Sequence, residues 1–225
     1  MSKGFSEELR GVSTRIWEAE LAHPFVQGLG DGTLSPERFR CYLEQDYLFL
    51  IDYARVFALG AAKAQELEMM TEFAGLCADT LKGEMDLHRS YCAEFGITPE
   101  ELEGVAPAQT TRGYTGHLLQ VAAAGDVLDI VAVVLPCQWG YAEVATHLRD
   151  QGMPAEPRYR KWIEMYASEE FDAYGRWLRG TMDRLAPQVS AERQARLKEI
   201  FHLSSRWEYL FWEQAWRMEQ WAVPE

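Results

Sequence analysis

The chain has 225 residues and a formal net charge of −13 at pH 7, and its lysine and arginine residues form no cluster. Because a phosphate backbone is bound through clustered positive charge, a nucleic-acid partner is not expected. Hydrophobic residues make up 48 % and charged residues 25 % of the chain, which is typical of a water-soluble globular protein and not of a disordered one.

The N-terminal stretch MSKGFSEELRGVS is polar and does not look like a secretory leader. No uninterrupted apolar run is expected to span a bilayer. We therefore predict a cytoplasmic protein without a membrane partner. None of the cysteines lies in a CxxC pair, so free thiols are predicted rather than disulfides or a zinc site. The cysteines are Cys41, Cys77, Cys92 and Cys137.

Helical periodicity dominates the chain. The first predicted helix covers residues 5–22 and stops at His23 and Pro24, and a turn-rich passage follows. Ser35 and Pro36 predict the start of a long helix that reaches about residue 64, with a bend at Gly60. Further helices are predicted over residues 66–95, 111–125, 130–152, 158–185 and 190–221.

No segment alternates between apolar and polar residues at the period of a strand, and the chain contains no asparagine for Asn-Gly hairpin turns. No repeat or low-complexity linker divides the chain. The sequence therefore predicts one all-α domain over residues 1–225, built from about seven or eight helices.

An apolar helical stretch, IVAVVLPCQWGYAEVATHL, carries Pro136 next to Cys137. Proline lacks an N–H and disturbs a helix interior, so we expect a kink beside the thiol. Tyr141 follows four residues later and shares a helix face with Cys137. Spacing alone leaves two readings open, an inert core thiol beside a tolerated kink and a reactive thiol facing a cavity.

Two carboxylates stand in unusually apolar surroundings. Asp46 lies in CYLEQDYLFLIDYARVF, where it needs a buried partner or a chemical role. Glu208 lies in SSRWEYLFWEQAW, where burial would suit a general acid or base. The alternatives are a structural hydrogen bond for Asp46 and a solvent-facing helical glutamate for Glu208.

Two carboxylate–histidine pairs, Glu84 with His88 and Glu143 with His147, are separated by four residues. Di-iron bundles use a separation of three, so a metal site is not predicted. His23 could ligate haem, but a histidine before a proline is more typical of a helix end.

Four segments together resemble the thiaminase II (TenA) family, in its cysteine-containing type. The segments are HPFVQGLGDGTLSPERFRCYLEQDYLFL, LPCQWGYAEV, RKWIEMYAS and SSRWEYLFW. They occur in the family's order and spacing, and the resemblance covers about residues 5–220. It implies a haem-oxygenase-like all-α bundle without haem, metal or other cofactor, usually assembled as a homotetramer.

The resemblance also implies a reaction and its catalytic residues. The family hydrolyses the side arm of 5-aminomethyl-2-methylpyrimidin-4-amine, and thiamin more slowly, and the hydroxymethyl pyrimidine enters thiamin salvage. Cys137 matches the nucleophile and Glu208 the catalytic carboxylate. Asp46 matches the aspartate that holds the aminopyrimidine edge.

Further positions match substrate-binding residues of the family. The aromatic set consists of Tyr114, Tyr141, Tyr166 and Phe211. Phe49 stands where relatives often have a tyrosine. Phenylalanine keeps the ring face but lacks the hydroxyl, so the resemblance does not predict the polar contact of that hydroxyl or the preferred side arm of the substrate. Two alternatives to the hydrolase are an enzyme of the pyrroloquinoline-quinone synthase type on the same fold and a pyrimidine-binding regulatory protein without activity.

Overall fold

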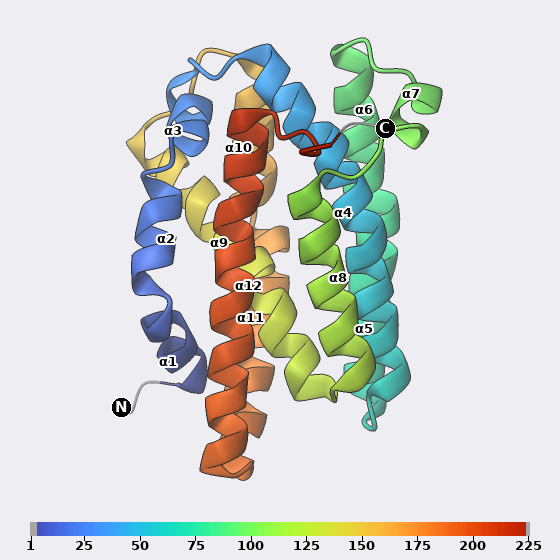
Figure 1. Cartoon of the computed structure of the whole chain (residues 1–225). Coiled ribbons are helices and arrows are strands. Elements are labelled where there is room, and N and C mark those ends of the chain that lie inside the picture. Colours follow the sequence, from blue (N-terminus) through green and yellow to red (C-terminus); the bar gives the residue numbers. More distant parts are fainter. Residues whose placement is uncertain (1–3, 224–225) are drawn as a thin grey trace. The chain divides into compact units, whose positions relative to one another are not determined.

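The computed structural model describes residues 4–223, apart from the side chains of Glu84, Leu87 and Pro99. These residues form helices and loops, and no strand occurs among them (Figure 1). The predicted all-α class is therefore confirmed. The elements are α1 (Phe5–Val12), α2 (Thr14–Leu21), α3 (Pro24–Asp31), α4 (Pro36–Lys63), α5 (Leu67–Asp79), the π-helical turn η1 (Thr80–Glu84), α6 (Met85–Glu94), α7 (Pro99–Glu103), α8 (Gln109–Ala124), α9 (Val127–Gln151), α10 (Pro157–Tyr166), α11 (Glu169–Leu185), the 3₁₀ turn η2 (Ala186–Gln188) and α12 (Ala191–Arg217).

Helix ends follow the capping signals in the sequence. The Ser35 hydroxyl accepts from the backbone N–H of Arg38 at 3.4 Å, and Pro36 occupies the first position of α4. Gly60 lies inside α4, where a Cβ would come within 2.6 Å of the Phe73 ring. The glycine thus permits close packing of α4 on α5, and the helix continues to Lys63.

The structure differs from the predicted segments in three places. Residues 5–22 form α1 and α2, which meet at Ser13, and residues 158–185 form α10 and α11. The turn-rich passage begins later in the chain than predicted, because residues 24–31 are helical as α3. His23 accepts from the N–H of Phe25 at 3.1 Å and Pro24 fits the first helical position, so the His-Pro pair starts a helix as well as ending one.

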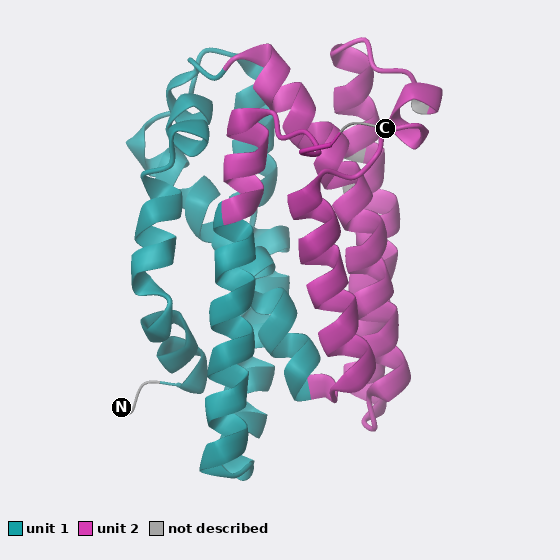
Figure 2. Ribbon diagram, viewed as in Figure 1, with its two compact units in different colours: residues 1–34, 128–209 teal, residues 35–127, 210–225 magenta. Residues whose placement is uncertain are grey.

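The chain divides into two compact units, shown in Figure 2. Unit 1 comprises residues 1–34 and 128–209, and unit 2 comprises residues 35–127 and 210–225. Both units are therefore assembled from separate stretches of the chain. The prediction of a single domain stays a prediction.

Helix α9 is the core helix of unit 1. Residues 128–142 are all buried, and the Trp139 ring lies 5.2 Å from that of Trp17. By length and composition alone, α9 is long and apolar enough to cross a membrane. However, 83 % of its most apolar stretch is buried in the protein, and core helices of water-soluble proteins pass the same test.

Unit 2 is built around α4, and Figure 1 shows α5 and α8 beside it. The Tyr42 and Trp212 rings stack at 5.7 Å. Lys63, at the end of α4, donates from Nζ to the carbonyls of Ala122 and Gly125 at 2.7 and 2.6 Å. This lysine satisfies carbonyls at the C-terminal end of α8, and its positive charge interacts favourably with the negative end of the helix dipole.

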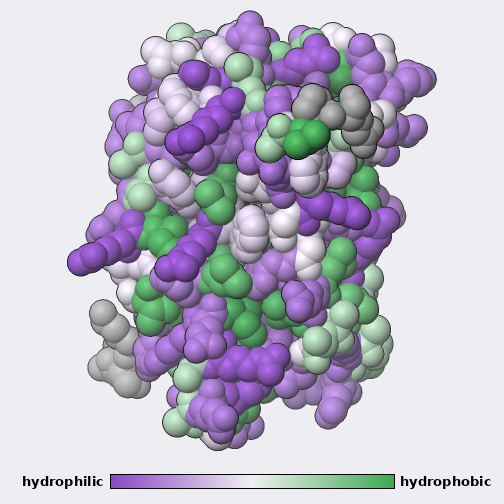
Figure 3. Space-filling model, in the orientation of Figure 1, coloured by the Kyte–Doolittle hydropathy of each residue, from purple (hydrophilic) through white to green (hydrophobic). Residues whose placement is uncertain are grey.

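The face of the molecule shown in Figure 3 is mainly hydrophilic. This face carries small groups of hydrophobic residues among hydrophilic ones. Exposed large apolar side chains occur on both units, and the most exposed in a helix is Leu67 at 77 %. They are Val12, Leu67, Met70, Leu81, Leu203, Leu210, Met218, Trp221 and Val223.

Candidate active site

Cys137 lies in the buried middle of α9, directly after Pro136. The helix runs through the proline from Val127 to Gln151 without ending there. Tyr141, one turn further on, is also buried, at 5 % exposure. Since residues four apart share a helix face, the thiol and the phenol are oriented to the same side of α9.

All four cysteines are thiols, as predicted. Burial raises the pKa of Cys41 and of Cys92 to about 11, with Glu44 adding to the shift in both cases. Burial also raises the pKa of Cys77. These three thiols are therefore held in the protonated form at neutral pH, which makes them poor nucleophiles.

Two of the predicted pocket tyrosines come together in unit 1. The Tyr141 and Tyr166 rings lie 5.0 Å apart in an edge-to-face arrangement, and Trp162 lies 4.6 Å from Tyr166. Phe171 closes the group at 4.9 Å from Tyr166. Such a cluster offers aromatic faces and two hydroxyl groups beside the helix that carries the thiol.

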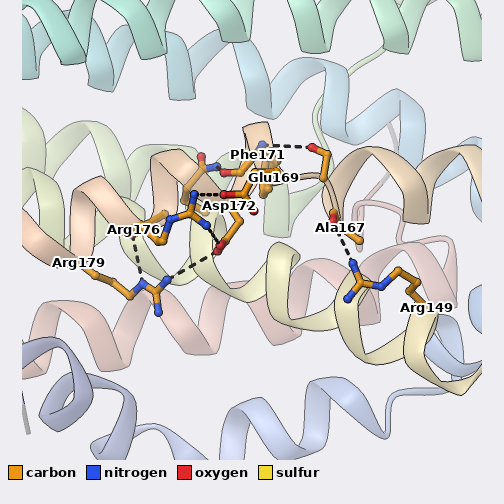
Figure 4. Close-up of polar contacts among 10 residues, drawn as sticks. Arg149, Ala167, Glu169, Phe171, Asp172, Arg176 and Arg179 are labelled. Atoms are coloured by element: carbon orange, nitrogen blue, oxygen red, sulfur yellow. Dashed lines mark hydrogen bonds and ion pairs between the residues drawn. The ribbon is translucent and has the colours of Figure 1, made fainter.

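The turn between α10 and α11 is fixed directly after Tyr166 (Figure 4). Arg149 donates to the carbonyl of Ala167 at 3.2 Å, and Arg176 forms an ion pair with Asp172. Gln138, next to the thiol on α9, donates to the carbonyl of Phe171 at 3.3 Å. These bonds tie the aromatic cluster to the helix segment around Cys137.

Glu208 is buried in unit 1, at 3 % exposure. The alternative of a solvent-facing glutamate is therefore wrong. A second buried carboxyl, Glu20 on α2, interacts electrostatically with Glu208. No motif in the sequence indicates a role for Glu20, although it lies three residues after Trp17 on the buried side of its helix.

Asp46 lies in unit 2 with two polar neighbours, at 3 % exposure. Its Oδ2 is 2.5 Å from Nε2 of His88, and it accepts from the Tyr42 hydroxyl at 3.3 Å. The predicted buried partner from a neighbouring helix thus exists, and it is a histidine of α6. Both groups hold the carboxylate in one orientation, which leaves Oδ1 for another hydrogen bond.

Phe49, Tyr114 and Phe211 form a second aromatic cluster in unit 2. The Phe49 ring lies 5.0 Å from Tyr114 and 5.4 Å from Phe211. Phe49 is on α4, three residues after Asp46, so the ring and the carboxylate share a helix face. Unit 2 therefore joins an aromatic surface to a hydrogen-bonding carboxylate, as recognition of a flat heterocycle requires.

The two carboxylate–histidine pairs have other roles in the structure. Glu143 binds Arg10 at 2.7 Å, and His147 interacts with Gln151 at 2.8 Å. His88 contacts Asp46, while the side chain of Glu84 lies outside the described residues. Within the described part of the chain, no group of three or more His, Cys, Asp and Glu residues could hold a metal ion.

Comparison with known proteins relates this chain to aminopyrimidine enzymes. It is 45 % identical to an aminopyrimidine aminohydrolase of Halalkalibacterium halodurans, covering 96 % of this chain and 97 % of that protein. A TenA homologue of P. horikoshii OT3 superimposes with a TM-score of 0.88 at 31 % identity, covering 96 % of this chain and 99 % of that one.

A more distant structure supports the fold alone. A domain of unknown function from Shewanella denitrificans with a heme oxygenase-like fold matches with a TM-score of 0.73 at 13 % identity, over 97 % of this chain and 94 % of that one. The family model described as TENA/THI-4/PQQC matches residues 13–218. The chain has the haem-oxygenase-like fold and belongs to the TENA/THI-4/PQQC family.

Proposed function

We propose that the protein is an aminopyrimidine aminohydrolase, a thiaminase II, that serves thiamin salvage. Its substrate is 5-aminomethyl-2-methylpyrimidin-4-amine, with thiamin as a slower substrate, and the products are the hydroxymethyl pyrimidine and ammonia. The 45 % identity to an aminopyrimidine aminohydrolase over nearly the whole of both chains supports this function. The observation that carries it is a thiol at Cys137 beside the tyrosine cluster, in a unit that also buries Glu208.

The first step of the proposed reaction is addition of the Cys137 thiolate to the unsubstituted ring carbon of the pyrimidine. A new carbon–sulfur bond forms, and the ring loses its aromaticity as electrons move toward the ring nitrogen. Asp46 holds the ring nitrogen and amino edge, and its carboxylate accepts a hydrogen bond from the amino group so that the ring is oriented for the addition. Its contact with His88 fixes the orientation of the carboxylate for this hydrogen bond.

The second step expels the amine and replaces it with water. The ring electrons break the bond between the methylene carbon and nitrogen, and Glu208 gives its proton to the leaving amine. Glu208 then removes a proton from water as the oxygen adds to the methylene carbon. The carbon–sulfur bond breaks, the thiolate leaves and the ring is aromatic again.

The aromatic residues of both units are proposed to bind the substrate. Tyr141 stabilises the thiolate by a hydrogen bond from one turn away, and Tyr166 packs beside it. In unit 2, Phe49 offers a ring face, and Tyr114 and Phe211 flank that ring. The roles proposed for these aromatic residues rest on the resemblance to the family.

We also infer a cytoplasmic homotetramer without nucleic-acid or membrane partners. Support for the assembly comes from the family resemblance and from exposed apolar side chains such as Leu67. The net charge of −13 disfavours binding to polyanions, which supports the inference that nucleic acid is not a partner. Sedimentation velocity over a range of protein concentrations tests the assembly, and a stable monomer would contradict it.

A direct assay tests the proposed function. We expect kcat/KM to be highest for the aminomethyl pyrimidine when it is compared side by side with its N-formyl precursor and thiamin. Release of ammonia and of the hydroxymethyl pyrimidine are both measured. Tight binding of the hydroxymethyl pyrimidine in calorimetry without turnover of any of the three compounds would instead indicate a binding protein.

A further inference from the structure

The buried carboxyl of Glu20 has no place in the reaction described above. Glu20 is 3 % exposed, and within residues 4–223 its Oε1 has no hydrogen-bond partner. Burying a carboxylate without compensation is costly, and a carboxyl group in such a place tends to keep its proton. The group therefore needs either a compensating cation or a proton.

Contacts between α2 and α12 align Glu20 with Glu208. The Ser13 hydroxyl and His202 Nδ1 are 3.2 Å apart, and Trp17 Nε1 donates to the Ser205 hydroxyl at 3.0 Å. The latter pair is separated by 188 residues along the chain. Glu20 lies three residues after Trp17, and Glu208 lies three residues after Ser205, which is about one helical turn on each helix. The register of the two helices therefore places Glu20 and Glu208 opposite each other.

The charged groups around Glu20 come from three elements. They are Arg10 on α1, Glu143 on α9 and Glu208 on α12. Arg10 is the one cation among them, and it donates from Nε and Nη2 to Glu143 at 3.4 and 2.7 Å. Its charge is therefore largely balanced by Glu143, which leaves Glu20 beside a second buried carboxyl.

The pKa of Glu20 agrees with this geometry. Burial raises it well above the ordinary value of 4.5, and the charge of Glu208 raises it further. Glu143 acts in the same direction and Arg10 in the opposite one. Two carboxyl groups coupled in this way titrate as a pair, and one proton is retained to a higher pH than either group alone would hold it.

We propose that Glu20 is a positioning residue that shares one proton with Glu208 and so keeps Glu208 supplied with the proton it gives to the leaving amine. This inference rests on the proposed function of Glu208. When the carbon–nitrogen bond breaks, its electron pair stays on nitrogen and the shared proton moves to that nitrogen. When water adds to the methylene carbon, its released proton returns to the carboxyl pair, so the pair ends the cycle with one proton.

The test is the pH dependence of kcat/KM for the aminomethyl pyrimidine in the full-length protein. Glu20→Gln removes the second titrating group without changing the size of the side chain. We expect the basic limb of the profile to move to lower pH by about one unit or more, so that activity on that side falls roughly tenfold. Glu18→Gln, an exposed position on the same helix, should keep the wild-type profile.

A uniform loss of activity in Glu20→Gln with an unchanged profile would overturn the inference, since a merely structural role predicts that result. Infrared spectroscopy of the wild-type protein in D₂O decides the case if Glu20→Gln does not fold. A carbonyl stretch from a protonated carboxyl group at neutral pH is expected, and its absence would also overturn the inference. If the wild-type protein turns over no substrate, the proposed function fails, while the infrared band still reports on the shared proton.

Discussion

Asp46 and His88 form a buried contact in unit 2, with 2.5 Å between Oδ2 and Nε2 and exposures of 4 % and 1 % for the side chains. The aspartate comes from α4 and the histidine from α6. Removal of one member of such a pair leaves a buried polar group without its compensation, which costs more than the pair contributes.

We predict that His88→Phe lowers the free energy of unfolding by about 3 kcal/mol, because the buried Asp46 carboxylate loses its contact with the imidazole. Urea denaturation measures this loss. The variants Asp46→Asn and Asp46→Asn/His88→Phe complete a double-mutant cycle, in which the second substitution should cost much less once the carboxylate is gone. Strictly additive effects would show that the contact contributes no coupling energy.

Substrate selection is predicted to depend on Phe49. Phe49→Tyr adds the hydroxyl group common among the family's members, and a new hydrogen bond to the side-arm amine would contribute about 1 kcal/mol. We expect kcat/KM for the aminomethyl pyrimidine to rise roughly fivefold relative to thiamin. Phe49→Leu serves as the control for the ring face and should raise KM for both substrates. An unchanged ratio in Phe49→Tyr would mean that this position does not determine the side-arm preference.

The burial of Glu20 gives a prediction for stability as a function of pH. In the unfolded chain this carboxyl ionises near its ordinary pKa of 4.5, whereas in the folded protein its pKa is raised. Between these two values the folded state holds more protons than the unfolded state, so stability falls as the pH rises. The slope for one full proton is about 1.4 kcal/mol per pH unit.

Glu20→Gln removes this dependence, so the variant should gain stability relative to the wild-type protein as the pH rises above about 4.5. Denaturant titrations at several pH values measure the difference, and Glu18→Gln controls for the loss of a carboxylate from α2. A difference that stays constant with pH would show that the folded and unfolded states ionise alike.

Pro136 is predicted to set the position of the neighbouring thiol. A proline inside a helix leaves the carbonyl four residues earlier without its donor and can displace the chain locally. If this displacement orients Cys137, Pro136→Ala lowers kcat by about tenfold to a hundredfold, as small misplacements of a nucleophile do. Alkylation of the thiol by iodoacetamide should slow in parallel. Equal activity and equal alkylation in the variant would make the proline incidental.

The sequence predicted the helices well because they are encoded locally. Ser35 with Pro36 starts α4, and apolar spacing extends it. The passage after His23 was misjudged, since His-Pro also satisfies the rules for a helix start. Local rules of this kind do not choose between a stop and a start when the same residues can do both.

The candidate site was predictable only in part. Pro136, Cys137 and Tyr141 stand out within one segment, whereas Tyr114 and Tyr166 follow only from the resemblance to the family. The partners of the carboxylates were not, because His88 and Glu20 come from other helices and nothing in their own segments specifies the contact. The burial of Glu208 could not be predicted for the same reason. Helical spacing shows which residues share a face with Glu208, but packing against distant segments determines that this face is buried.

The proposed mechanism requires the Cys137 thiol to be the nucleophile. Steady-state ammonia release from the aminomethyl pyrimidine is compared for the wild-type protein, Cys137→Ala and Cys41→Ala, which removes a thiol with a pKa raised to about 11. We expect Cys137→Ala to lose activity by about a thousandfold or more, while Cys41→Ala stays close to wild type. Wild-type turnover in a folded Cys137→Ala protein would contradict the covalent mechanism.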